Sequence, residues 1–261
     1  PCISLLLAAL SVGNINLFSL AGAFTQANYA LVSLAAVAWV VGYAIRAFRW
    51  RTILGSDVKA PFIRITKVML IGFLANNVLP VRLGELVRSY YLARREKLNT
   101  SSALATIAVE RVYDGITLLA FAVLAAPWLL LLGEFDGAAD ISRTTGVIFL
   151  AAAIAAFAVL LVVFTLLGSS PAFASRMEGL LNIVPAGPRP KIKAFFWTFV
   201  AGLAVLNSPS KHLALFVYSL PVWLLEGSMY FMLAYSFGID EHFDSVGVLL
   251  LVVLLLTATS N

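Results

Sequence analysis

Three charged residues with helical spacing, Glu110, Arg111 and Asp114, interrupt a long apolar stretch of the chain. Residues 103–109 before them and 115–132 after them are mostly apolar. Because positions three and four apart are neighbours on a helix, all three side chains can converge on one face. If the stretch crosses a membrane, counting back about 20 residues from its end puts them at headgroup depth. Charged side chains are costly there unless they pair or serve a function.

A second polar group lies upstream, in N-N-V-L-P-V-R-L-G-E-L-V-R at 76–88. Its proline and glycine interrupt a helix, which leaves backbone polar groups that only protein or a water-filled cavity can satisfy. The two asparagines offer amides at the same place. The charged residues Arg82, Glu85 and Arg88 follow at spacings of three. Glu85 and Arg88 therefore share a face if 84–97 is helical. The residues of this group are Asn76, Asn77, Pro80, Arg82, Gly84, Glu85 and Arg88.

The two groups together carry no net charge, because three arginines oppose three carboxylates. We therefore expect a neutral, desolvated network at the cytoplasmic leaflet. Such a network either binds an anionic headgroup, since arginine forks suit phosphate geometry, or only holds helices together. Its expected members are Arg82, Arg88 and Arg111 against Glu85, Glu110 and Asp114.

One more carboxylate, Glu226, lies near the middle of the apolar stretch 213–237, shortly after the helix-perturbing Pro221. No basic residue is near it in sequence. It must pair with an arginine of the network, stay protonated because burial disfavours its charge, or face a wet cavity. We expect it to line the path of a transported group or to carry a proton.

The composition is that of an integral membrane protein. Hydrophobic residues make up 61% of the 261 residues and charged residues only 12%, with a mean hydropathy of +0.96. A soluble domain has too little interior to hide so much apolar surface. One cysteine and two histidines predict no internal disulfide, no metal site and no cofactor. The net charge is +5, and the positions of the basic residues relative to the apolar runs predict how the chain is oriented in the membrane. No nucleic-acid partner is expected.

The apolar runs predict an all-α, polytopic transmembrane helix bundle, forming a single domain over residues 1–261. A helix needs about 20 apolar residues to cross the hydrocarbon. Full-length spans are expected at 29–48, 100–132, 145–167 and 213–237, and spans cut by the ends of the sequence at 1–12 and 246–256. This makes six spanning segments. Residues 193–206 are expected to form a short helix at the membrane interface.

The charges between these runs predict the orientation. Loops 46–67, 82–99 and 168–193 are basic, whereas 133–144 and 239–244 are acidic. Because basic loops stay inside, the first three are expected in the cytoplasm of a protein of the cell (inner/plasma) membrane.

Residues 68–80 are apolar but have basic residues on both sides. Thirteen residues reach only about 20 Å as a helix, which is too short to cross. The sequence therefore favours a re-entrant hairpin that turns at 76–80. The alternative is a conventional span with 84–97 as its return leg.

Motifs of catalysis are missing from the sequence. It has no phosphate-binding glycine loop, no G-x-S-x-G and no H-E-x-x-H. The largest stretch outside the apolar runs, 168–193, is too short for a catalytic domain. We expect no enzymatic activity, although the paired carboxylates leave open a membrane-embedded lipid-modifying transferase.

The stretch at 76–88, followed by A-L-A-T-I-A-V-E-R-V-Y-D at 103–114, resembles the flippase-like family named for the transmembrane region of lysylphosphatidylglycerol synthase. R-A-F-R-W-R at 46–51 and P-V-W-L-L-E at 221–226 fit it as well. The resemblance covers nearly the whole chain. The family usually continues into a further motif, and the synthase carries a separate transferase domain. Neither is present in this sequence.

The resemblance implies a lipid translocase that handles an anionic phospholipid or a polyprenyl phosphate at the cytoplasmic leaflet. Its partners would be membrane lipids, and a separate synthase or glycosyltransferase if the chain is a non-catalytic subunit. The signature residues that match the family are Asn76, Pro80, Arg82, Gly84, Glu85, Arg88, Glu110, Arg111 and Asp114.

Overall fold

The computed structural model describes residues 17–55, 58, 60–79, 83–131, 143–242 and 253, and every regular element among them is a helix. This confirms the expected all-α class. The long helices are α3 (Tyr29–Leu54), α6 (Thr100–Leu131), α7 (Arg143–Ser169) and α10 (Pro209–Ser236). The shorter elements are α2 (Leu17–Gln26), α4 (Phe62–Val78), α5 (Gly84–Glu96), α8 (Pro171–Leu180), η2 (Leu181–Ile183), α9 (Arg189–Gly202), η3 (Leu203–Asn207) and η4 (Asp240–His242).

Three helices in the described part are long and apolar enough to cross a membrane: Tyr29–Leu54, Ala151–Ser169 and Pro209–Ser236. They coincide with three of the four full-length spans expected from the sequence. The fourth, α6, has 32 residues and is long enough, but its charges interrupt the apolar stretch. The expected spans at 1–12 and 246–256 fall outside the described residues, apart from residue 253, so the number of six spans and the single domain stay predictions.

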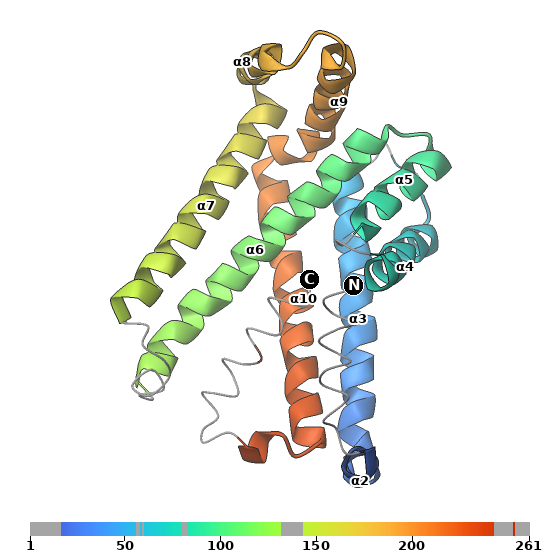
Figure 1. Ribbon diagram of the computed structural model, residues 1–261, viewed down its shortest axis with the longest axis vertical. Coiled ribbons are helices and arrows are strands. Elements are labelled where there is room, and N and C mark those ends of the chain that lie inside the picture. The colour runs from blue at the N-terminus through green and yellow to red at the C-terminus, as the bar shows by residue number, and fades with distance from the viewer. Residues whose placement is uncertain are drawn as a thin grey trace.

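Helices α3 and α10 form an antiparallel pair that runs from the lower end of the molecule to below α8 and α9 (Figure 1). Two hydrogen bonds join the start of α3 to the end of α10. The Asn28 backbone N–H donates to the Ser236 backbone carbonyl at 2.9 Å, and the Ser236 hydroxyl donates to the Asn28 backbone carbonyl at 3.1 Å. The Asn28 side chain also accepts hydrogen bonds from the first amides of α3, which caps that helix. Leu225 of α10 packs on α3 at Gly42, where an added Cβ would lie 3.6 Å from the Leu225 Cβ, an ordinary van der Waals contact. The pair forms a frame on which α4 and α6 pack.

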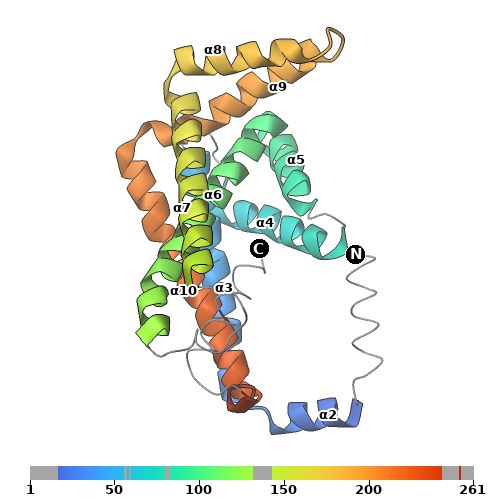
Figure 2. The same cartoon turned by 60° about the vertical axis from the view of Figure 1, so that its left-hand side comes forward.

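Helices α4 and α5 form a hairpin beside this frame (Figure 2). Their 17 and 13 residues reach about 25 and 20 Å, less than the thickness of the hydrocarbon. The lengths favour a re-entrant hairpin. The expected turn at 76–80 is wrong, however, because α4 stays helical through Val78 and the second leg is the helix Gly84–Glu96. Pro80 and Arg82, near the tip, lie outside the described residues.

The two legs touch through glycines. A Cβ on Gly84 would lie 2.0 Å from the Gly72 carbonyl oxygen and 2.5 Å from the Asn76 side-chain oxygen. The Gly84 amide donates to that same Asn76 oxygen at 2.7 Å. Asn76 thus fixes the start of α5 rather than breaking α4, which is why the helix continues past it.

Gly84→Ala is expected to destabilise the fold by about 1–3 kcal/mol or more, because the methyl group has no room and backbone must shift. The matched control is Gly179→Ala in α8, where a Cβ meets nothing within 4 Å; there alanine should be neutral or stabilising by up to about 1 kcal/mol. Unfolding in detergent measures both. Equal stability of the two variants would contradict the close approach.

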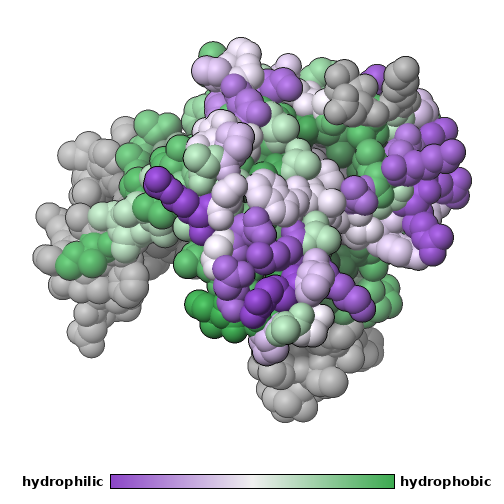
Figure 3. Space-filling view, turned by 90° about the horizontal axis from the view of Figure 1, so that it is seen from above, coloured by the Kyte–Doolittle hydropathy of each residue, from purple (hydrophilic) through white to green (hydrophobic). Residues whose placement is uncertain are grey.

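Hydrophilic side chains gather at the end of the molecule where α5 ends and where α8 and α9 lie (Figure 3), and the exposed basic residues there include Arg94, Arg95 and Arg176. There Lys193 joins α9 to α8 by donating to Glu178 at 2.8 Å, and this hydrogen bond holds the pKa of Glu178 below its usual range. The acidic η4 lies at the opposite end (Figure 1). Most of the acidic loop predicted at 133–144 lies outside the described residues, so the sidedness of the loops stays a prediction, as does the interfacial position of 193–206.

Candidate functional site

Arg49 of α3 is the centre of a buried ion network. Its side chain has no exposed surface. One guanidinium nitrogen, Nη1, donates to Asp114 Oδ1 and to the Ser219 hydroxyl, each at 2.6 Å, and the other, Nη2, donates to Glu110 Oε1 at 3.1 Å. Glu110 and Asp114 therefore converge on one face of α6, as their spacing predicted. One arginine ties α3 to α6 and α10.

Arg88 brings the hairpin into this network. Its Nη2 donates to the second oxygen of Glu110 at 2.7 Å, so that carboxylate is shared between two buried arginines. The Arg88 guanidinium also lies over the Trp50 ring, 3.6 Å from its centroid, a favourable cation–π position. Trp50 is itself buried and donates to the Thr106 hydroxyl at 3.1 Å. Helices α3, α5 and α6 thus meet at one charged centre.

Arg111 forms a more exposed part of the network. It lies 2.7 Å from Glu85 of α5 and 3.5 Å from Asp114, one turn along its own helix. About a third of the Arg111 and Glu85 side chains is exposed, whereas Glu110 is almost fully buried. Asp114 also accepts a hydrogen bond from the Trp223 indole at 3.1 Å. The network therefore runs from a dry centre to a wetter edge.

Glu226 pairs with an arginine, but not with one of the three arginines that the sequence placed in the expected network. Its partner is Arg46 of α3, whose Nη2 donates to Glu226 Oε2 at 2.6 Å. The two side chains are only 14% and 11% exposed. The Arg46 guanidinium also lies 5.5 Å from the Trp223 ring centroid. This pair connects α3 to α10.

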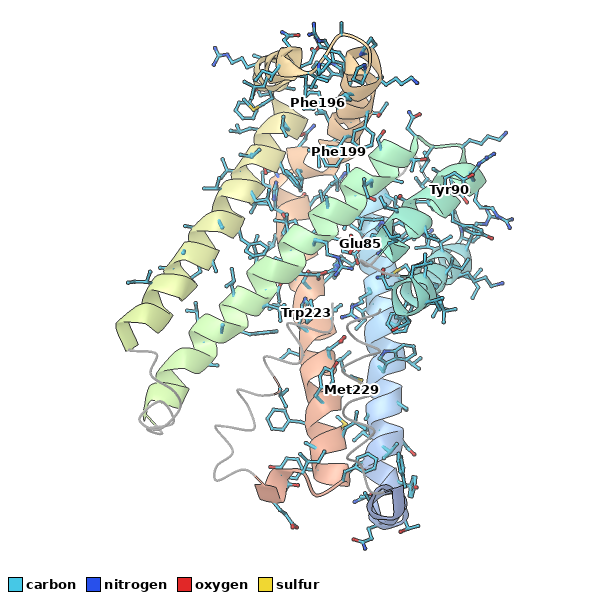
Figure 4. All side chains as sticks on the ribbon, in the orientation of Figure 1. Glu85, Tyr90, Phe196, Phe199, Trp223 and Met229 are labelled. Carbon is cyan, nitrogen blue, oxygen red and sulfur yellow. The ribbon has the colours of Figure 1, made fainter. Side chains whose placement is uncertain are left out.

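The charged groups border a cavity of about 300 Å³ between α3, α4, α5, α6 and α10. Figure 4 labels Glu85, which lines the cavity at the start of α5, and Trp223 of α10, which lies behind the lining and donates to Asp114. Of the predicted site residues, those that line the cavity are Asn76, Asn77, Gly84, Glu85, Arg88, Glu110, Arg111, Asp114 and Glu226. The other two, Pro80 and Arg82, are outside the described residues.

Arg46 and Arg49 were not predicted as site residues, and the prediction that both lie in a loop at 46–67 is wrong. Helix α3 continues to Leu54, and it carries both arginines into the protein interior. The buried face of α3 could have indicated this, because Ala35, Ala38 and Gly42 are spaced by three and four and the next positions on that face are Arg46 and Arg49. Trp39 and Tyr43, which line the cavity, were missed as well.

The described network is still neutral. Four arginines now oppose four carboxylates, and neutrality is what a buried group of charges requires. The members are Arg46, Arg49, Arg88 and Arg111 with Glu85, Glu110, Asp114 and Glu226.

Helices this apolar, with a buried neutral ion network and a polar cavity, define an integral membrane protein. The chain belongs to the family described as the lysylphosphatidylglycerol synthase TM region, whose model matches residues 2–260. The chain is 36% identical over 122 residues to "Glycosyltransferase AglD" of Haloferax volcanii, a match that covers 46% of this chain and 19% of that protein. It is 30% identical over 109 residues to "UPF0104 membrane protein MJ1595" of Methanocaldococcus jannaschii, covering 41% of this chain and 32% of that protein.

The chain thus spans less than a third of the length of either curated relative that it matches. No solved structure matches it. The comparisons establish the family and the membrane class, whereas the cavity and its charges come from the structure itself.

Proposed function

We propose that the protein binds the anionic headgroup of a membrane lipid in the cavity and moves the lipid between leaflets. The observation that carries this proposal is that three arginines, Arg46, Arg88 and Arg111, line one cavity of about 300 Å³ inside a bundle of membrane helices. Cavities of this size hold small ligands. Arginine forks suit phosphate oxygens, so a phospholipid or a polyprenyl phosphate is the ligand class that the chemistry favours.

The hairpin supports the same proposal. Irregular backbone at membrane depth occurs where it lines a cavity, and broken helices mark the binding sites of many transporters. Here the start of α5 and the last turns of α4 both border the cavity. With the basic end in the cytoplasm, the headgroup would enter from the cytoplasmic leaflet of the cell membrane.

Leaflet exchange in liposomes tests the proposal. Fluorescent phosphatidylglycerol, or a fluorescent polyprenyl phosphate, is incorporated with the purified protein, and an impermeant quencher reports the fraction in the outer leaflet. We expect exchange of one of the two lipids above the rate in protein-free liposomes. No exchange of either by folded protein would refute the translocase proposal.

A second candidate is a non-catalytic membrane subunit that assists a separate synthase or glycosyltransferase. It is favoured by the match of nearly half of this chain to a protein named as a glycosyltransferase. In that case the protein co-purifies with such an enzyme and exchanges no lipid alone. We further propose that the chain catalyses no lipid modification; a modified lipid formed by the purified protein alone would refute this.

A further inference from the structure

We propose that Glu226 is an internal substitute for the ligand anion: it occupies Arg46 while the cavity is empty, and the incoming anionic headgroup displaces it and binds Arg46 and Tyr43. This inference rests on the proposed function and deepens it, because it names the residues of α3 and α10 that contact the headgroup.

The four arginines of the network differ in how completely they are bound. Arg49 is fully buried, and both ends of its guanidinium are bound to carboxylates. Arg88 is nearly as buried and is held between Glu110 and the Trp50 ring. Removing either from its partners would leave a buried charge without compensation, which costs several kcal/mol. These two arginines therefore act as scaffold.

Arg46 is less deeply buried than Arg49 and Arg88, because its side chain is 14% exposed against 0% and 6%. Among the described residues its guanidinium binds Glu226 through Nη2, one of the five N–H donors of an arginine. Arg46 and Glu226 both line the cavity. A phosphate could use two of the donors at once, which a single Nη2 contact to a carboxylate does not. Exchange of one anion for another keeps the charge of Arg46 compensated throughout.

Tyr43 supplies an independent sign of a missing ligand. It lies one turn before Arg46 on α3, lines the same cavity and is only 8% exposed. Its hydroxyl is buried, and it has no hydrogen-bond partner among the described residues. A buried hydroxyl without a partner is uncommon, because it loses its hydrogen bonds to water without replacement. An oxygen of a bound headgroup would satisfy it.

Aromatic rings close this side of the cavity. Trp39 stacks on Tyr43 with ring centroids 5.5 Å apart, and Phe73 of α4 lies against both rings. They hold the Tyr43 ring in place, so that Tyr43 and Arg46 present two donors from successive turns of one helix. The hydroxyl is thus preorganised to receive an acceptor.

Equilibrium binding to the purified protein in detergent tests the displacement. Short-chain phosphatidylglycerol and, separately, inorganic phosphate are titrated, with tryptophan fluorescence as readout and native mass spectrometry as a check. If Glu226 occupies Arg46 in about nine molecules of ten, Glu226→Gln tightens binding about tenfold. Its matched control is Glu241→Gln, an exposed glutamate in η4 at the opposite end, which should leave affinity unchanged.

The other two variants should weaken binding. Tyr43→Phe removes only the unpaired hydroxyl and is expected to lower affinity about fivefold without loss of stability. Arg46→Lys keeps the charge opposite Glu226 but loses the fork, and is expected to lower affinity about tenfold. Its control is Arg51→Lys, exposed on the same helix. If the Glu226 variant does not fold, Tyr43→Phe and Arg46→Lys still test the proposal, because an ion pair with only a structural role would leave the affinity of both variants unchanged.

The outcomes separate the two proposals. Wild-type binding of phosphatidylglycerol without tightening in folded Glu226→Gln overturns the displacement alone. No wild-type binding of either probe overturns both the displacement and the headgroup site. Equal ranking of the variants with inorganic phosphate, but no binding of phosphatidylglycerol, supports displacement at Arg46 and overturns phosphatidylglycerol as the ligand.

Discussion

Glu110→Gln is expected to lower the free energy of unfolding by about 3–5 kcal/mol, because it leaves two buried arginines facing an uncharged amide. Glu110 is the only carboxylate that the structure places on both Arg49 and Arg88 among the residues it describes. Unfolding in detergent, followed by circular dichroism, measures the loss. The matched control is Glu96→Gln, whose partner Arg64 is half exposed; an exposed pair contributes about 1 kcal/mol or less.

A double variant sharpens this prediction. Arg88→Met removes the second charge of the pair, so Arg88→Met with Glu110→Gln should cost less than the sum of the two single changes. Additive losses would show that Arg88 and Glu110 are not coupled. A stability of Glu110→Gln within 1 kcal/mol of wild type, as expected only for a surface pair, would contradict the buried network itself.

Arg111→Gln is expected to reduce lipid exchange to the rate of protein-free liposomes while the protein stays folded. Arg111 lines the cavity, and about a third of its side chain is exposed, so it can contact a headgroup. Its nearer partner, Glu85, is about a third exposed, and the buried Asp114 keeps its ion pair with Arg49. The loss of stability should therefore be far smaller than for Glu110→Gln. The leaflet-exchange assay and a melting curve in detergent measure the two effects on the same preparation.

Arg94→Gln is the matched control for this variant. Arg94 lies on α5 and is exposed at the basic end, away from the cavity lining. It should exchange lipid at the wild-type rate. Wild-type exchange by Arg111→Gln would remove Arg111 from the headgroup site, and collapse of its folding would mean that Arg111 belongs to the scaffold with Arg49.

The sequence predicted well what depends on neighbouring residues. Apolar length predicted the helices that became α3, α7 and α10, and spacing predicted that Glu110 and Asp114 share a face of α6. The sequence predicted a hairpin within 68–80, whereas the hairpin in the structure has α4 and α5 as its legs. Its turn was misplaced because Asn76 caps the start of α5 across space, a contact between residues eight positions apart that no local pattern contains.

The partners of the carboxylates could not be predicted in the same way. Arg49 is 61 positions from Glu110, and Arg46 is 180 positions from Glu226. Near the end of an apolar run, an arginine usually marks the membrane boundary. The sequence signal against a boundary position was the small residues Ala38 and Gly42, two turns and one turn before Arg46, because small residues on one face indicate that another helix packs there. The pairing itself required the three-dimensional structure.

The separation of Arg49 from its counter-charges has a consequence for biogenesis. Helix α3 is synthesised well before α6, yet both carboxylates that neutralise Arg49 are on α6. An arginine without a counter-charge is costly in hydrocarbon. During synthesis we therefore expect Arg49 to stay at the membrane surface or in the insertion machinery until residues 110–114 have been made. Helix α3 would reach its final depth only after Arg49 has paired with them.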